Sequence, residues 1–115
     1  MNELKIFETE KDKVYVTGDT LYLETAPVKT GQVLEINHIG ATFENLDTTE
    51  YVVLGYYNGH AYIPLYKNKP SVASDFVFWN GTIYLREGQF IYAYFADVAN
   101  GEKMKLRANG IWLKW

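Results

Sequence analysis

Aliphatic residues recur at every second position in several segments of this chain, the pattern of strands that bury one face. In QFIYAYFA, residues 89–96, nearly every residue is apolar, so both faces of that strand would be apolar. We find no segment of useful length in which apolar residues recur with the period of a helix. Five dipeptides that favour tight turns separate the alternating segments: Gly18-Asp19, Asn58-Gly59, Asn80-Gly81, Asn100-Gly101 and Asn109-Gly110. Such pairs adopt the positive φ angles of two-residue hairpin loops. The pattern predicts an all-β chain built from consecutive hairpins.

A two-residue loop fixes the register of its hairpin, so each turn predicts which residues lie opposite each other. The pairs expected across the five turns are Val16–Leu21, Leu54–Ile63, Phe78–Ile83, Phe95–Leu106 and Arg107–Trp112. Between the hairpins, residues 32–46 are expected to form one long strand with a bend or bulge near Gly40. About nine to eleven short strands with turns at this spacing predict an antiparallel two-sheet β-sandwich, jelly-roll-like, as a single domain over residues 1–115.

These registers divide the apolar residues between two faces. The aliphatic set is predicted to point inward: Val14, Val16, Leu21, Leu23, Val52, Leu54, Ile63, Leu65, Ile83, Leu85, Ile91, Phe95, Leu106 and Leu113. Nine tyrosines then point outward, and Tyr56 points inward: Tyr15, Tyr22, Tyr51, Tyr57, Tyr62, Tyr66, Tyr84, Tyr92 and Tyr94. An aromatic outer face is either a solvated sheet face strengthened by cross-strand pairs or a surface for a partner, where Tyr, Trp and Arg dominate the contacts.

The composition narrows the possible functions. A chain of 115 residues is one domain by its length, and the absence of cysteine excludes disulfides and thiolate metal sites and fits a reducing cytosol. The net charge of −3 gives no reason to expect a nucleic-acid partner. The first residues lack the apolar core of a signal peptide, and no apolar run is long enough to cross a membrane, so no membrane partner is expected.

Candidate catalytic chemistry is sparse. His60 flanks a predicted turn, and His38 is better explained as a hydrogen-bonded strand residue than as a metal ligand. The carboxylates Glu44, Asp47 and Glu50 are typical of a polar loop, although a catalytic pair could be drawn from them. No phosphate-binding glycine loop or nucleophile elbow occurs. We therefore predict no enzyme activity, no catalytic residue, no cofactor and no metal.

The best candidate for a contact surface is a row formed across the last two predicted hairpins by Tyr94, Arg107 and Trp112, because a guanidinium can stack between two rings. The other interface candidates are Tyr92, Tyr62 and Tyr66. The alternative function is a lectin-like module that stacks these rings on a host cell-wall saccharide. Lectin sites usually add a group of Asp, Asn and Gln side chains, and here only Asn109 lies near Trp112 in the sequence.

The closing segment, LREGQFIYAYFADVANGEKMKLRANGIWLKW, resembles small β-sandwich virion proteins of tailed phages in its rhythm of strands and Asn-Gly turns. GQVLEINHIGATFENLDTTEYVVLGYYNGHAYIPL is similar to the middle of such domains, so the resemblance spans roughly residues 31–115. The nearest likeness is to small distal-tail proteins of Bacillus siphophages, whose fold is similar to the shoulder domain of lactococcal phage receptor-binding proteins.

The resemblance implies a structural protein of the tail or adsorption apparatus, made in the host cytoplasm and located in the tail region of the virion. Its expected partners are other virion proteins and, as a second option, further copies of itself. The family has no motif-defined site, so the resemblance assigns no role to any residue of this chain. It covers none of residues 1–30.

Overall fold

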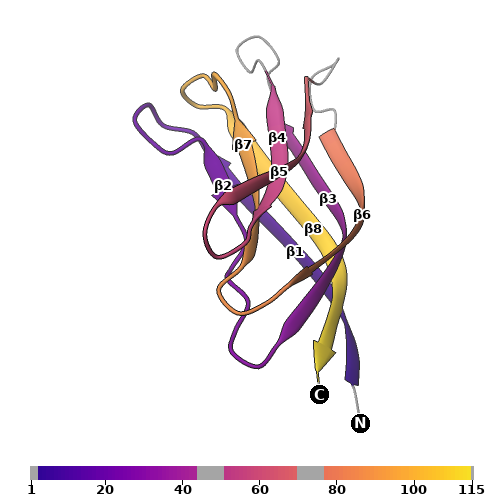
Figure 1. Ribbon diagram of the computed structural model, residues 1–115. Coiled ribbons are helices and arrows are strands. Elements are labelled where there is room, and N and C mark those ends of the chain that lie inside the picture. Colours follow the sequence, from indigo (N-terminus) through magenta and orange to yellow (C-terminus); the bar gives the residue numbers. More distant parts are fainter. Residues whose placement is uncertain (1–2, 44–50, 70–76, 115) are drawn as a thin grey trace.

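A computed structural model describes residues 3–43, 51–69 and 77–114 of the chain, and all regular structure in these ranges is β-strand (Figure 1). The strands are β1 (Glu3–Val14), β2 (Tyr22–Glu24), β3 (Val33–Phe43), β4 (Val52–Tyr57), β5 (Tyr62–Asn68), β6 (Val77–Leu85), β7 (Phe90–Phe95) and β8 (Lys103–Lys114). They form two four-stranded sheets, of order β1-β8-β3-β6 and β2-β7-β4-β5, in which the paired strands are antiparallel. The predicted antiparallel two-sheet β-sandwich is confirmed.

The order of the strands is that of an eight-stranded jelly roll. Successive strands along the chain mostly alternate between the two sheets, so they pack face to face instead of pairing edge to edge. Among the described strands, only β4 and β5 are neighbours both in sequence and in a sheet. The prediction that the sandwich is built from consecutive hairpins is therefore wrong for every turn except the one at Asn58-Gly59.

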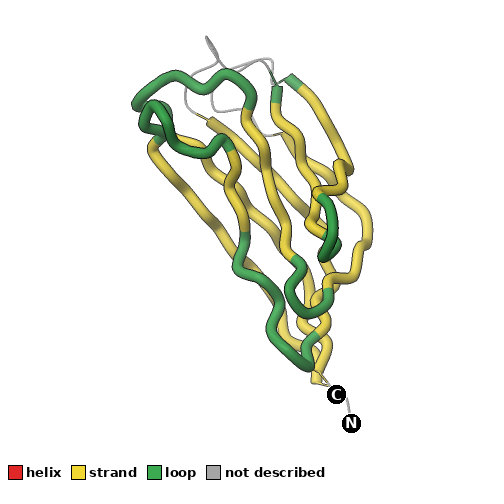
Figure 2. The backbone as a smooth tube through the Cα atoms, turned by 60° about the vertical axis from the view of Figure 1, so that its left-hand side comes forward, coloured by secondary structure: helices red, strands yellow, loops and turns green. Residues whose placement is uncertain are grey.

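Two of the predicted turns exist but connect the sheets. Gly18 and Gly101 have positive φ angles of 98° and 87°, as tight turns require. Both turns lie at the same end of the sandwich, where Tyr15 exchanges backbone hydrogen bonds with Glu102 and Gly101, and Thr17 binds the Asn100 side chain. The loops are the long connections at the upper left of Figure 2. The pairs Val16–Leu21 and Phe95–Leu106 are therefore absent, because their members lie in different sheets or in the loops.

Two other Asn-Gly pairs lie inside continuous strands. Gly81 is in the middle of β6, where a side chain would collide with the Trp79 ring, 2.5 Å from the position of a Cβ atom. Gly110 is in β8, where a Cβ atom would overlap the backbone of Glu35 in β3. These glycines provide space for close packing, and the predicted pairs Phe78–Ile83 and Arg107–Trp112 do not form.

The hairpin at Asn58-Gly59 is confirmed with a different register. Its loop has four residues instead of two, so Tyr57 lies opposite Tyr62 and Leu54 lies opposite Tyr66 after a bulge. The Asn58 side chain stabilises the wider loop by accepting hydrogen bonds from the backbone N–H groups of residues 60 and 61. The long strand around Gly40 is β3, and its irregularity falls between Ile36 and His38.

The core lies between the two sheets, and much of the predicted inward set occupies it. The buried members of that set are Leu23, Val52, Leu54, Leu85, Ile91, Phe95 and Leu106. Tyr56, Leu65 and Ile83 pack against them, as predicted. The inward assignment is wrong for Val14 and Val16, which are 53% and 57% exposed, while Tyr15 packs on the core. The inward assignment of Val14 and Val16 depended on a hairpin at Gly18-Asp19, and that hairpin does not form.

Candidate interaction surface

The outer face of the β2-β7-β4-β5 sheet carries a continuous aromatic surface. We call it the tyrosine face and define it by Tyr22, Tyr51, Tyr57, Tyr62, Phe90, Tyr92 and Tyr94. Strand pairing brings these rings together: Tyr22 lies opposite Tyr94, and Tyr57 lies opposite both Phe90 and Tyr62. Directly opposed side chains of antiparallel strands have Cβ atoms only about 5 Å apart. The sheet register therefore builds this surface.

Tyr22 and Tyr62 connect the rings of the tyrosine face. The Tyr22 centroid lies 4.9 Å from that of Tyr94 and 5.2 Å from that of Tyr62. Tyr62 in turn lies 5.3 Å from Tyr57, whose ring stacks on Phe90 at 5.0 Å. These separations are in the range of favourable aromatic pairs. The rings hold one another in place, so the surface is preorganised.

Gly55 makes room for the most buried ring of this face. It lies opposite Tyr92, which points away from the core yet is only 3% exposed. A Cβ atom at position 55 would lie 2.7 Å from the Tyr92 ring. The absence of a side chain lets that ring cover the strand, with Tyr62 against it at 5.0 Å in an edge-to-face arrangement. Gly55 is thus required for the shape of the face.

Charged side chains lie at the border of the tyrosine face. The Tyr62 hydroxyl donates a hydrogen bond to the Glu24 carboxylate at 2.6 Å, and this bond raises the pKa of Tyr62 to about 12. Burial raises the pKa of Tyr92 and of Tyr94. At the opposite border the Lys67 ammonium lies 4.0 Å from the centre of the Tyr51 ring. The hydroxyls of Tyr62, Tyr92 and Tyr94 therefore stay protonated near neutral pH, and the Tyr62 proton is already donated to Glu24.

The predicted row of Tyr94, Arg107 and Trp112 is not formed. Tyr94 belongs to the tyrosine face, whereas Arg107 lies on the outer face of the other sheet, where its guanidinium binds Glu10 at 3.0 Å. Trp112 points between the sheets and packs against the core. In a continuous β8, residues 106 and 112 share a face because they are an even number apart. The row depended on a hairpin at Asn109-Gly110, and β8 runs straight through that position.

The remaining interface candidates all lie on the β2-β7-β4-β5 sheet. Tyr92 and Tyr62 belong to the tyrosine face, and Tyr66 is on β5 at the edge of the same sheet, 40% exposed. The interface candidates did not include four members of the tyrosine face: Tyr22, Tyr51, Tyr57 and Phe90. Tyr22 joins the face only because β2 pairs with β7, a strand almost seventy residues later. A signal for Phe90 was present, since it shares the outward parity of Tyr92 and Tyr94. That these side chains contact a partner remains a prediction.

The outer face of the β1-β8-β3-β6 sheet has a different character. Glu10 bridges Lys105 and Arg107, at 3.3 and 3.0 Å, and these two cations lower the pKa of its carboxyl, Arg107 contributing most. Asp12 pairs with Lys103 at 3.5 Å. The outward carboxylates of β1 face the outward cations of β8, so they compensate one another within the chain. The charged groups of this face are therefore less available to a partner than the rings of the tyrosine face.

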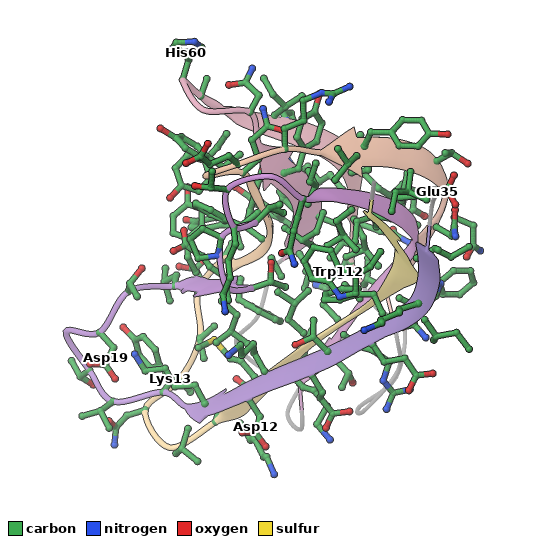
Figure 3. All side chains as sticks on the ribbon, turned by 90° about the horizontal axis from the view of Figure 1, so that it is seen from below. Asp12, Lys13, Asp19, Glu35, His60 and Trp112 are labelled. Atoms are coloured by element: carbon green, nitrogen blue, oxygen red, sulfur yellow. The ribbon has the colours of Figure 1, made fainter. Side chains whose placement is uncertain are left out.

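The two histidines lie far from any organised site. His38 Nδ1 lies 2.7 Å from Asn80 Oδ1, as expected for a hydrogen-bonded strand residue, and His60 projects from the β4–β5 loop (Figure 3). Within ranges 3–43, 51–69 and 77–114, no group of three or more potential ligands could hold a metal ion. The acidic cluster of Glu44, Asp47 and Glu50 lies outside the described residues. In the described part, no helix is long and apolar enough to span a membrane.

Fold and surface together define an eight-stranded jelly-roll β-sandwich with one aromatic outer face and one ion-paired outer face. No protein-family model matches this sequence, and no curated protein matches it either. The fold is similar to that of a chain in the acid-stable capsid of Helicobacter pylori bacteriophage KHP30, with a TM-score of 0.62 and 10% sequence identity. The match covers 98% of this chain and 93% of that chain. At this identity the likeness shows the fold alone.

Proposed function

We propose that this chain is a non-enzymatic structural protein of a phage particle and that it binds other virion proteins through the tyrosine face. The observation that carries the proposal is the set of seven preorganised rings on one outer face. Rigid aromatic side chains contribute much contact area at little cost in conformational entropy, and they dominate the binding energy of protein interfaces. A protein partner would cover these rings.

The phage context has two supports. The fold neighbour is a chain of a phage capsid, and because the match covers nearly all of both chains, it is a chain of comparable size. The strand rhythm of residues 31–115 separately resembles virion proteins of tailed phages. The neighbour favours a position on the capsid, and the resemblance favours the tail or adsorption apparatus. Immunogold labelling of purified particles would distinguish these two positions.

Incorporation into particles tests the proposal. Tyr62→Ala removes a central ring of the tyrosine face, and Tyr84→Ala is a matched control. Both tyrosines are exposed, 43% and 53%, and both hydroxyls donate to a glutamate, Glu24 and Glu35. Tyr84, however, lies on β6 in the other sheet. Truncating an interface anchor typically costs 2 kcal/mol or more, about a thirtyfold loss of affinity.

We expect Tyr62→Ala to be depleted from purified particles, measured by quantitative mass spectrometry, while Tyr84→Ala is incorporated like the parent. A parent chain that is absent from the particles would refute the virion role. Equal incorporation of both variants would refute the tyrosine face as the contact surface. Circular dichroism of both purified variants controls for loss of the fold.

A further inference from the structure

A pocket opens between the two sheets at the end of the sandwich opposite the Gly18 and Gly101 turns. The inner face of the β1-β8-β3-β6 sheet contributes Phe7, Leu34 and Trp112, and the segment between β2 and β3 covers them with Pro27 and Lys29. Thr9, Thr25, Ala26 and Gln32 complete the lining, and the pocket volume is about 270 Å³. Figure 3, which looks at the molecule from below, shows Trp112 inside the ring of ribbons. The pocket is therefore an open site with apolar walls and a cation.

Phe7 and Trp112 give the pocket a rigid apolar wall. Their ring centroids are 5.3 Å apart and their planes are nearly perpendicular, at 87°. Both rings pack against the core, so they are held from behind. A wall of two fixed rings and a proline suits an aliphatic side chain, which gains hydrophobic contact without having to order the pocket.

A matching aliphatic side chain occurs on the same strand. Ile6 is 82% exposed, and it lies opposite the half-buried Ile111. Glu8 is also exposed and shares the outer face of β1 with Ile6, because the two residues are two positions apart. The outside of β1 therefore presents an isoleucine next to a carboxylate.

The pocket and this isoleucine cannot meet within one molecule. Phe7 lines the pocket on the inner face of β1, and its neighbour Ile6 points to the outer face, since successive residues of a strand point to opposite sides. Contact between them requires two molecules. The charges also fit, because Lys29 lies at the pocket and Glu8 lies beside Ile6.

We propose that Ile6 of one copy of this chain inserts into the Phe7–Trp112 pocket of a second copy, with Glu8 of the first copy facing Lys29 of the second. The contact joins two different surfaces, so it is heterologous and propagates from copy to copy. It forms a ring where the rotation closes and a filament where it does not. This self-association uses a surface separate from the tyrosine face and does not depend on the proposed virion role.

The absence of cysteine from the chain allows a direct test by crosslinking. An Ile6→Cys variant is mixed under oxidising conditions with a Gln32→Cys variant that carries a tag, and the mixed disulfide dimer is measured by mass. Phe78→Cys is the matched control, since Phe78 is also well exposed, at 54%, but lies on β6 at the opposite edge of that sheet. We expect several times more mixed dimer from Ile6→Cys than from Phe78→Cys. Equal yields would overturn the proposal.

Self-association of the unmodified chain supplies the second readout, by analytical ultracentrifugation over a range of concentrations. Ile6→Asp should weaken it about thirtyfold or more, as expected for the loss of a central anchor. Glu8→Lys and Lys29→Glu should each weaken it, and the double variant should recover most of the loss. An Ile6→Asp variant that associates like the parent, or a double variant without recovery, would overturn the proposal.

A saccharide is the other kind of ligand that an aromatic pocket could hold. Cell-wall polysaccharide could quench tryptophan fluorescence in a saturable way. If this quenching were the same in the monomer and in the self-associated chain, it would assign the pocket to sugar binding and overturn the proposal. Competition between polysaccharide and self-association would place both on the same pocket and would support the interface between copies. We expect no saturable change with polysaccharide.

Discussion

Leu106→Ala probes the inward face of β8 most directly. The Leu106 side chain has no exposed surface and packs in the central cluster of the core. The change removes three carbon groups worth about 0.8 kcal/mol each in transfer free energy, and the cavity left behind adds a further cost. We expect the free energy of unfolding to fall by about 2–5 kcal/mol. For a chain of 115 residues, a loss of about 3 kcal/mol lowers the melting temperature by roughly 12 °C.

Arg107→Ala on the adjacent position is the control. Arg107 lies on the outer face, and its ion pair with Glu10 joins side chains that are 46% and 43% exposed. Exposed ion pairs contribute less than about 1 kcal/mol, and Glu10 keeps its contact with Lys105. Urea denaturation of both variants measures the two losses. A larger loss for Arg107→Ala than for Leu106→Ala would mean that the strand is turned over, and it would refute the assignment of the two faces.

Three further predictions follow from the turns and the tyrosine face. Gly55→Ala should lower the free energy of unfolding by about 1–3 kcal/mol in urea denaturation, because the added methyl group overpacks against the Ile63 carbonyl oxygen and the Tyr92 ring. An unchanged midpoint would contradict the close approach. Gly101→Ala should cost about 1 kcal/mol in the same measurement, since its φ of 87° strains any residue with a side chain, and a stabilised variant would rule this out. Glu24→Gln should lower the pKa of Tyr62 from about 12 toward 10.0, as measured by tyrosinate absorbance. Because the pKa is raised in the folded state, the stabilisation from this hydrogen bond is complete below pH 10 and is lost as the pH rises through 12.

The class of fold could be predicted because alternation of apolar and polar residues is a local property. Residues such as Leu54, Ile91 and Leu106 are correctly predicted to be inward, since each lies in a strand whose parity does not depend on which partner it has. Parity failed where it was carried through a hairpin that does not form, as at Val14 and Trp112. In a jelly roll the pairing partners are distant in sequence, so hairpin reasoning assigns the wrong neighbours even when the strands are right.

The Asn-Gly pairs show why the topology could not be predicted. Gly101 is a true turn, whereas Gly110 provides space for the backbone of β3, and the sequence around both reads Asn-Gly between alternating segments. What distinguishes them is the presence of a neighbouring strand, a feature that is fixed only when the whole sheet assembles. The tyrosine face was only partly predictable, because part of it depends on which strands pair. The outward parity of Tyr92 and Tyr94 is local, but their contact with Tyr22 depends on the pairing of β2 with β7.

The pairing of β1 with β8 has a consequence for how the chain reaches its native state. Glu3 lies opposite Lys114, and the whole of β1 pairs with β8, so the two ends of the fold are side by side (Figure 1). Contacts between residues so distant in sequence require closure of a very long loop, and folds of high contact order acquire their structure slowly. β1 must therefore wait without a partner until β8 is in place. Its many charged side chains, among them Lys5, Glu10 and Asp12, discourage it from pairing with strands of other molecules during that time.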